Sequence, residues 1–263
     1  MNKIYVIKIG GNVIDNEEKL TAFISNLSIA NKPFILVHGG GKLATDLAEK
    51  LSIPQQMVDG RRITDAQTLK IAVMTYAGYI NKNIVAMCQK NNINSMGFSG
   101  ADGNLIQANK RPAEPIDFGF VGDISKNSVN VSFLKKILQL ELTPVICAIT
   151  HNNEGQLLNT NADAIANAIA TSLAPFYEVE LVYCFEKKGV LLNPDDEDSY
   201  IKNLCLKEFH DLKNKNIINK GMIPKLENCF DALQNGVSEI GIINASNIAN
   251  YLNKNNNEGT RIR

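Results

Sequence analysis

The sequence predicts an α/β fold in which a mainly parallel, doubly wound sheet carries helices on both faces. Short apolar runs rich in Val and Ile alternate with helical stretches along most of the chain. These runs are nearly continuous in apolar character, which is typical of strands covered on both faces. Repeated strand–helix–strand order then favours parallel strands joined by helical crossovers.

The predicted strands are short and β-branched, and the predicted helices lie between them. The strands are Ile4–Ile9, Phe34–Val37, Val145–Ile149, Glu180–Cys184 and Ile240–Ile243. The helices are Glu17–Ser28, Leu43–Leu51, Asp65–Asn91, Ser132–Leu140, Ala162–Leu173 and Pro224–Gln234. We expect Thr64 and Asn161 to cap two of these helices, because a side-chain oxygen there accepts a hydrogen bond from the first turn.

Two stretches do not follow this alternation. Leu51–Thr64 and Ser95–Asp123 contain short extended pieces separated by Gly, Pro and Asp turns. Such pieces indicate hairpins that flank a site rather than further helical crossovers. No segment resembles a linker, so we expect a single domain over residues 1–263.

Composition excludes several classes of function. Lys and Arg together number 27, as do Asp and Glu, so the net charge is zero and nothing suggests a nucleic-acid surface. No apolar run reaches the length of a membrane span, and the N-terminus lacks the apolar core of a signal peptide. The five cysteines are odd in number and have no C-x-x-C spacing. We therefore expect a cytoplasmic protein with reduced thiols and neither a membrane nor a nucleic-acid partner.

Two glycine clusters, Gly10–Gly11 and Gly39–Gly41, each follow a predicted strand. Glycines at the carboxyl ends of parallel strands let backbone amides approach an anion closely. One cluster alone would suit a tight turn equally well, but two on neighbouring strands favour an anion site. Neither a P-loop nor a G-x-G-x-x-G pattern is present. The nearest approach to a serine-hydrolase elbow, Gly97–Ala101, lacks the final glycine.

Charged and polar residues accompany these clusters. Lys8 interrupts an apolar strand, so its ammonium reaches solvent at the strand end or meets an anion. Lys225 begins a predicted helix and, taken alone, is typical of a surface residue. Asn159, Asn161 and Asp163 stand close together before an Ala-rich helix, which indicates more than capping. Arg62 suits a carboxylate, which a guanidinium binds through two parallel hydrogen bonds.

Taken in order, these segments resemble the amino-acid kinase family, and within it the acetylglutamate kinases. The resemblance runs nearly end to end, and the order and spacing of its motifs are specific. The matching segments are Lys8–Gly11, Val37–Gly41, Asp59–Thr64, Ser99–Gly103, Gly119–Asp123, Asn159–Asp163, Gly221–Lys225 and Gly259–Ile262.

The resemblance implies a three-layer αβα sandwich that transfers the γ-phosphate of ATP to the side-chain carboxylate of an N-acyl-L-glutamate, in arginine biosynthesis. It implies an acyl-amino-acid lobe of about residues 1–175 and an ATP lobe of about residues 176–263, with transfer between them. Phosphoryl transfer relies on positioning and electrostatic stabilisation, and an ionised carboxylate acceptor needs no general base. Mg²⁺ is expected to accompany ATP, held by phosphates and water rather than by a protein metal site.

The same resemblance implies a role for individual residues. Lys8 and Lys225 would neutralise charge on the transferred phosphoryl group, and Asp163 would orient both lysines. The implied phosphate- and ATP-binding residues are Gly10, Gly11, Glu186, Gly189 and Lys225. The implied substrate-binding residues are Gly40, Gly41, Arg62, Asn159 and Arg61.

The chain departs from the family pattern at three positions. Glu186 stands where relatives commonly carry the Asp of a Thr-Asp-Val-x-Gly pattern, and Ala101 replaces a usual lysine. Arg61 replaces an apolar residue beside Arg62. A solvent-facing side chain is the simpler interpretation of Arg61, but a second cation would suit an acyl group that ends in a carboxylate. N-succinylglutamate therefore stands beside N-acetylglutamate as a candidate substrate.

Assembly and two alternative functions complete the expectations. Arginine-inhibited relatives carry an additional N-terminal helix, and this chain starts almost at its first strand, so we expect an arginine-insensitive homodimer paired through Asp65–Asn91.

An aspartate- or glutamate-kinase-like enzyme would share the lysines and glycines but lack the Arg62 and Asn159 arrangement. A non-catalytic amino-acid-binding regulatory protein would have lost Lys8, Asp163 or Lys225, all of which are present.

Overall fold

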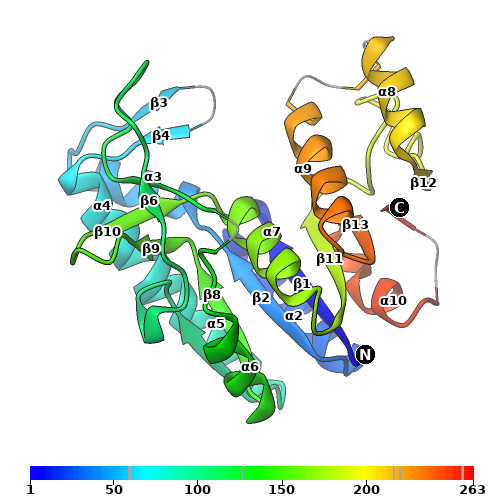
Figure 1. Cartoon of the computed structure of the whole chain (residues 1–263), viewed down its shortest axis with the longest axis horizontal. Coiled ribbons are helices and arrows are strands. Elements are labelled where there is room, and N and C mark those ends of the chain that lie inside the picture. The colour runs from blue at the N-terminus through cyan, green and yellow to red at the C-terminus, as the bar shows by residue number, and fades with distance from the viewer. Residues whose placement is uncertain (59–60, 126, 216, 219–220, 256–257) are drawn as a thin grey trace. The chain divides into compact units, whose positions relative to one another are not determined.

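The computed structural model describes residues 1–58, 61–125, 127–215, 217–218, 221–255 and 258–263. The chain divides into two compact units (Figure 1). Unit 1 consists of Met1–Phe34 and Ile169–Arg263, and unit 2 consists of Ile35–Ala168. The first 34 residues thus group with the C-terminal part of the chain, although the sequence placed them in the same lobe as the residues that follow.

Pairing between β1 (Lys3–Ile9) and β11 (Glu178–Phe185) explains this grouping. The two strands run parallel, in register from Lys3 opposite Glu178 to Ile9 opposite Cys184. β13 (Glu239–Asn244) pairs in parallel with the other edge of β11. β14 (Thr260–Ile262) then runs antiparallel to β13 and parallel to the short β12 (Asn203–Leu204).

Helices connect the strands of unit 1. They are α1 (Gly11–Ile14), α2 (Glu17–Ala30), α8 (Leu206–Asn214), α9 (Ile223–Gln234) and α10 (Ile248–Leu252), with the 3₁₀ turn η3 (Ala245–Asn247). α7 (Ala162–Leu173) spans the boundary between the units. The strand interiors are apolar and fully buried, as in Val6, Ile7 and Leu181. Burial on both faces explains why these strands read as continuous apolar runs.

Unit 2 has its own parallel strands, β2 (Phe34–His38), β8 (Thr143–Cys147) and β5 (Ser95–Phe98), with β8 in the middle. A second, smaller sheet has the order β6 (Asn109–Lys110), β7 (Val121–Asp123), β10 (Leu157–Thr160) and β9 (Ile149–His151). β3 (Gln56–Val58) and β4 (Arg61–Ile63) form an antiparallel ribbon.

The helices of unit 2 follow the predicted ranges closely. They are α3 (Gly41–Lys50), α4 (Ala66–Ala72), α5 (Asn81–Lys90) and α6 (Val131–Gln139), with the short 3₁₀ turn η2 (Asp102–Asn104). The long helix predicted over Asp65–Asn91 is a continuous run of α4, the π-helical segment η1 (Val73–Ile80) and α5. A π segment has about one more residue in each turn than an α-helix, which changes the side chains that share one face of the helix.

The α/β prediction is confirmed, with corrections in detail. Ser95–Phe98 is not part of a hairpin but a parallel strand beside β8, which buries Ser95 and Phe98. Thr64 does not cap the long helix; the cap is Asp65, whose carboxylate accepts from the Thr68 amide at 2.7 Å. The predicted strand Val145–Ile149 is interrupted at Ala148, where β8 gives way to β9. Helix α8, which is rich in Lys, Glu and Asp, was not predicted.

Among the described residues, no helix combines the length and the apolarity that crossing a membrane requires. Four of the five cysteines are buried as free thiols, and Cys205 is exposed.

Candidate functional site

Two lysines from distant parts of the sequence meet around one aromatic ring in unit 1. Lys8 lies near the carboxyl end of β1, and Lys225 lies in the first turn of α9. The Lys8 Nζ is 5.4 Å from the centroid of the Phe185 ring, and the Lys225 Nζ is 3.8 Å from it. The face of an aromatic ring attracts a cation, so Phe185 favours both ammonium groups at the end of β11.

A second ring supports Phe185. Tyr183 stands two residues earlier on β11 and therefore on the same face of the strand. The two rings stack with centroids 6.2 Å apart and an interplanar angle of 11°. Tyr183 also lies 5.9 Å from the Lys225 Nζ and is almost completely buried. The aromatic pair thus extends from the core of unit 1 to the lysines.

The first glycine cluster reaches the same place. The Gly10 amide donates to the Cys184 carbonyl at 3.2 Å, which ties the end of β1 to the end of β11. A Cβ at Gly10 would lie 3.5 Å from that carbonyl and 3.7 Å from the Phe185 ring, both ordinary contacts. Packing therefore does not demand glycine here, whereas the close approach of a ligand to the backbone would.

Glu186 has partners within unit 1. Its carboxylate accepts a hydrogen bond from the Asn12 Nδ2 at 2.8 Å and another from the Lys19 Nζ at 3.0 Å. The Lys19 hydrogen bond, assisted by the Lys19 charge, lowers the pKa of Glu186. In this structure Glu186 connects the end of β11 to the segment that carries α1 and the start of α2. Its role in ATP binding stays a prediction.

Gly189 has a structural reason to be glycine. A Cβ there would come within 2.5 Å of the Thr260 Oγ1 and 3.0 Å of the Thr260 amide nitrogen. Thr260 also accepts a hydrogen bond from the Val190 amide at 2.8 Å. The segment after β11 is therefore fastened to β14. Whether Gly189 also contacts ATP stays a prediction.

In unit 2 the second glycine cluster packs against the π-helical segment. Gly40 has a φ of +152°, and a Cβ there would lie 2.1 Å from the Ile80 Cδ1 and 3.1 Å from the Tyr76 ring. Only glycine fits this approach. Gly41 begins α3, and its carbonyl accepts a hydrogen bond from the Arg62 Nη2 at 2.9 Å. The geometry thus brings Gly40, Gly41 and Arg62 together, and their role in substrate binding stays a prediction.

Arg62 is held in one orientation by several acceptors. Its Nη2 also donates to the Thr45 Oγ1 at 2.8 Å, and its Nη1 donates to the Gln55 Oε1. Arg61 precedes it on β4 and is exposed. Successive side chains of a strand point to opposite faces, so Arg61 and Arg62 leave the ribbon in different directions. Asp59 and Gly60 of the same predicted motif lie outside the described residues.

Asn159 lies on β10, and its Nδ2 donates to the Thr64 Oγ1 at 3.1 Å. Thr64, predicted as a helix cap, is instead completely buried and forms an isolated β-bridge with Gly119. Asn161 does cap α7: its Oδ1 accepts from the Ala164 amide at 3.0 Å. Asp163 follows in the first turn of α7 and is half-buried. Its proposed action on the two lysines stays a prediction.

His38 was not singled out from the sequence, although it follows an apolar strand and precedes three glycines. It is fully buried, its Nδ1 lies 2.9 Å from the Gly39 carbonyl oxygen, and its Nε2 lies 3.0 Å from the Asn81 Nδ2. Burial lowers the pKa of His38 to about 4. A neutral ring that donates through Nδ1 and accepts at Nε2 satisfies both contacts. His38 thereby anchors the glycine loop to α5.

The comparisons with known proteins agree with these features. Residues 3–244 match the family model described as "Amino acid kinase family". The chain belongs to the amino acid kinase family. It is 48% identical over 263 residues to an acetylglutamate kinase of Cytophaga hutchinsonii, covering 100% of this chain and 99% of the relative. It is 45% identical to an acetylglutamate kinase of Bacteroides thetaiotaomicron over 99% of this chain and 98% of that one.

A solved structure of the same family fold supports the architecture. Carbamate kinase from Giardia lamblia, bound to AMP-PNP, superposes with a TM-score of 0.72 at 16% identity, covering 99% of this chain and 98% of that one. At this identity the likeness establishes the fold alone. The family resemblance inferred from the sequence motifs is confirmed, as is the α/β fold.

Proposed function

We propose that this protein transfers the γ-phosphoryl group of ATP to the γ-carboxylate of an N-acyl-L-glutamate, a step of arginine biosynthesis. The proposal rests on identity of 45–48% over essentially the full chain with relatives named acetylglutamate kinase. Lys8, Lys225, Asp163, Arg62 and Asn159, which the motifs imply for this chemistry, are all present.

The lysines of unit 1 suit the transferred phosphoryl group. In phosphoryl transfer, negative charge spreads over the oxygens of the moving group, and fixed cations stabilise it. Lys8 and Lys225 are already brought together at Phe185. Packing does not require glycine at Gly10, which favours close approach of a phosphate to the backbone as the reason for it. The attacking carboxylate is ionised at neutral pH, so no side chain has to remove a proton from it.

Mg²⁺ belongs to this proposal as a companion of ATP. The described residues contain no group of three or more His, Cys, Asp or Glu side chains arranged to hold a metal ion. Mg²⁺ binds nucleotide phosphates readily and keeps several water ligands, so it fits a site of lysines and backbone amides when it arrives with ATP. It would neutralise part of the phosphate charge there.

Arg62 and Asn159 of unit 2 suit the acyl amino acid. Three acceptors fix the Arg62 guanidinium, and a guanidinium has five N–H donors, so donors remain for a carboxylate. We assign the α-carboxylate to Arg62 and the amino-acyl portion to Asn159. We assign Gly40 and Gly41 to this region because the Gly41 carbonyl contacts Arg62, and packing against Ile80 separately requires glycine at position 40.

N-acetylglutamate is the first candidate for the substrate, and N-succinylglutamate is the second. Arg61 is exposed and leaves β4 on the face opposite Arg62, so a succinyl carboxylate would meet it only beyond the edge of the ribbon. Free glutamate as the preferred acceptor would indicate a glutamate-kinase-like enzyme instead. A non-catalytic regulatory protein is disfavoured because Lys8, Asp163 and Lys225 are all retained.

The test is turnover of ATP to ADP by purified protein with Mg²⁺ and each of three acceptors: N-acetylglutamate, N-succinylglutamate and glutamate. Hydroxylamine traps the acyl phosphate and so separates carboxylate transfer from simple ATP hydrolysis. We expect trapped product with an acylated acceptor. ADP without trapped product, or no turnover with any acceptor, would overturn the proposal.

We also propose that the protein is cytoplasmic and forms a homodimer through the α4–η1–α5 helix. Met74 and Tyr79 of η1 are large apolar side chains that are 52% and 66% exposed. Apolar side chains so close together on one helix favour a protein interface. Light scattering should give twice the chain mass for the native protein and a lower mass for Tyr79→Glu. A native monomer would contradict this assembly.

A further inference from the structure

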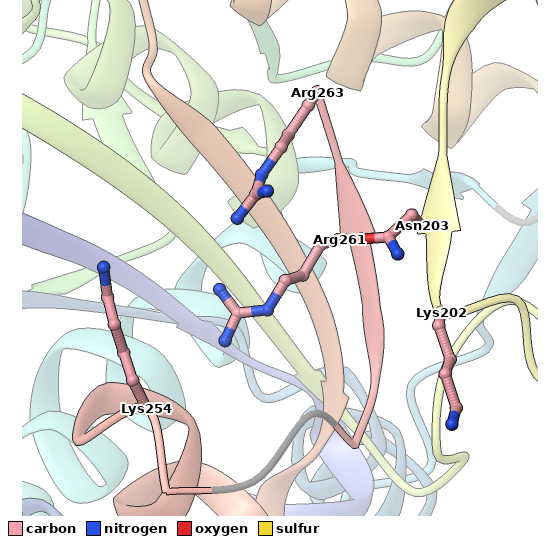
Figure 2. A pocket seen from close by; sticks show the side chains of 5 residues that line it. All are labelled: Lys202, Asn203, Lys254, Arg261 and Arg263. Atoms are coloured by element: carbon pink, nitrogen blue, oxygen red, sulfur yellow. The ribbon is translucent and has the colours of Figure 1, made fainter.

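A second basic site lies in unit 1, away from the lysines at Phe185. It is a pocket of about 310 Å³ lined by Lys202, Asn203, Lys254, Arg261 and Arg263 (Figure 2). Four of these five side chains are cationic. In a chain whose net charge is zero, such a local excess of positive charge is notable because it focuses a positive potential into a concave surface.

Arg261 and Arg263 share one carboxylate partner, Glu239. They stand two residues apart on and just after β14, so their side chains leave the strand on the same side, toward Lys254 (Figure 2). Arg261 lies 4.4 Å from the Tyr251 ring and its side chain is 11% exposed. Both arginines donate to the carboxylate of Glu239. The buried Arg261 guanidinium is therefore pre-organised, which lowers the entropy lost when a ligand binds, whereas the Arg263 side chain is 63% exposed.

The carboxylates beneath the pocket do not balance its charge. Burial opposes ionisation of Glu239, but the charges of Arg261 and Arg263 hold its pKa below the ordinary value, so it carries one negative charge at neutral pH. The neighbouring buried carboxylate, Glu180, is paired with Lys3 at 2.6 Å. Within the described part of the chain, no hydrogen bond or ion pair engages the ammonium groups of Lys202 and Lys254.

The pocket is separate from the candidate active site. Glu239, which holds the arginines, is in register with Glu180 on β11, five residues before Phe185. Arg261 is opposite Gly241, which is in register with Val182 on β11. Strands rise about 3.3 Å per residue, so the pocket residues lie roughly 10–16 Å along the sheet from Phe185. The pocket is still connected to the segment after β11, because Thr260, which precedes Arg261, accepts a hydrogen bond from the Val190 amide.

We propose that this pocket is a second anion-binding site, for a small ligand that carries several negative charges on carboxylate or phosphate groups. Its volume lies at the lower end of ligand pockets, which range over roughly 300–1,000 Å³, so a small metabolite fits better than a nucleotide. Guanidinium groups bind carboxylates and phosphates alike through paired hydrogen bonds, and the lysines add charge. This inference does not depend on the proposed catalytic function.

Binding of two probes, citrate and pyrophosphate, tests the site by isothermal titration calorimetry on the full chain. Each probe is titrated into protein saturated with AMP-PNP in the absence of Mg²⁺, which citrate and pyrophosphate would chelate, so that the candidate ATP site does not contribute. The pocket variant is Lys202→Glu with Lys254→Glu. The matched control is Lys50→Glu with Lys90→Glu, two exposed lysines at helix ends in unit 2 that change the net charge equally.

We expect at least one probe to bind, with an affinity that falls tenfold or more in the pocket variant and changes less than twofold in the control. Binding of citrate alone would identify the ligand as a polycarboxylate, and binding of pyrophosphate alone would identify it as a phosphate compound. Binding of both would indicate a site that selects by charge. No binding of either probe would overturn the proposal, as would equal weakening in both variants. Because the readout is binding rather than turnover, its failure is distinguishable from failure of the catalytic proposal.

Discussion

Different kinds of contact surround the two sets of candidate residues. In unit 2, directional hydrogen bonds fix Arg62 to Gly41 and Thr45 and fix Asn159 to Thr64. In unit 1, Lys8 and Lys225 lie over the ring of Phe185. Hydrogen bonds set the direction of a donor, whereas the attraction of a cation to a ring does not select one N–H direction. The contacts suit the proposed tasks, because recognition of a carboxylate needs directed hydrogen bonds, whereas a transferred phosphoryl group needs positive charge placed beside it.

The largest effect is expected from the lysines. Lys8→Arg and Lys225→Arg keep the charge but replace a compact ammonium by a wider guanidinium. Loss of one well-placed group in a transition state lowers kcat by on the order of 10²–10³. We expect that decrease for each variant, with a much smaller change in the KM for ATP, measured by steady-state ADP release. Lys32→Arg, at an exposed position, is the control. Full activity of either active-site variant would remove that lysine from the mechanism.

Arg62→Lys tests the candidate residues of unit 2, which hydrogen bonds orient. A lysine cannot keep the hydrogen bonds to Gln55, Gly41 and Thr45 and also direct an N–H at a carboxylate, and loss of a charge-assisted bond costs about 1.5–3 kcal/mol. The KM for the acyl-glutamate should rise roughly 10- to 100-fold while the KM for ATP stays nearly constant. Arg61→Lys is the matched control at the adjacent exposed position, and there we expect wild-type constants.

The same adjacent position separates the two candidate substrates. If Arg61 binds a succinyl carboxylate, Arg61→Leu will lower turnover of N-succinylglutamate relative to N-acetylglutamate. An unchanged ratio would assign Arg61 to solvent, in agreement with its exposure.

Residues that interrupt an apolar or helical pattern could be predicted from the sequence as site residues, whereas residues that conform to such a pattern could not. Lys8 stood out because a charge interrupts an apolar strand, and Gly40 because glycines cluster after a strand. Phe185 was not identified, because an aromatic residue at the end of an apolar strand looks like core. Its role depends on Lys225, which arrives from α9 through tertiary folding. The strand Ser95–Phe98 was missed for a related reason, since Gly97 weakens a strand pattern that parallel pairing with β8 overrides.

The buried His38, which anchors the glycine loop of unit 2, predicts that the stability of the fold depends on pH. The pKa of His38 is about 4 in the folded protein, below its ordinary value of 6.5, because the ring is buried. Between these values the unfolded chain binds a proton that the folded chain does not, so stability falls as the pH is lowered from about 6.5. Above pH 6.5 both states are neutral and the contribution is constant. The slope is at most about 1.4 kcal/mol per pH unit.

Urea unfolding between pH 7.5 and 5 measures this slope. In His38→Gln the amide can still donate to the Gly39 carbonyl and accept from Asn81, but it does not titrate. We expect that variant to lose the His38 contribution to the slope, and His210→Gln, at an exposed position, to retain it. An unchanged slope in His38→Gln would show that the histidine is protonated in the folded protein.

The smallest effect is expected from Phe185, and it bears most directly on how the lysines are held. Phe185→Leu keeps an apolar side chain but removes the ring face, which is worth about 0.5–1 kcal/mol to a cation at a partly exposed site. We expect kcat to fall roughly two- to fivefold with the KM for the acyl-glutamate unchanged, and Phe185→Tyr to restore the wild-type value. If Phe185→Leu and Phe185→Tyr were equally impaired, packing against Tyr183 would explain the loss. If neither were impaired, the lysines would be positioned by other contacts, and the contrast between the two units would not extend to catalysis.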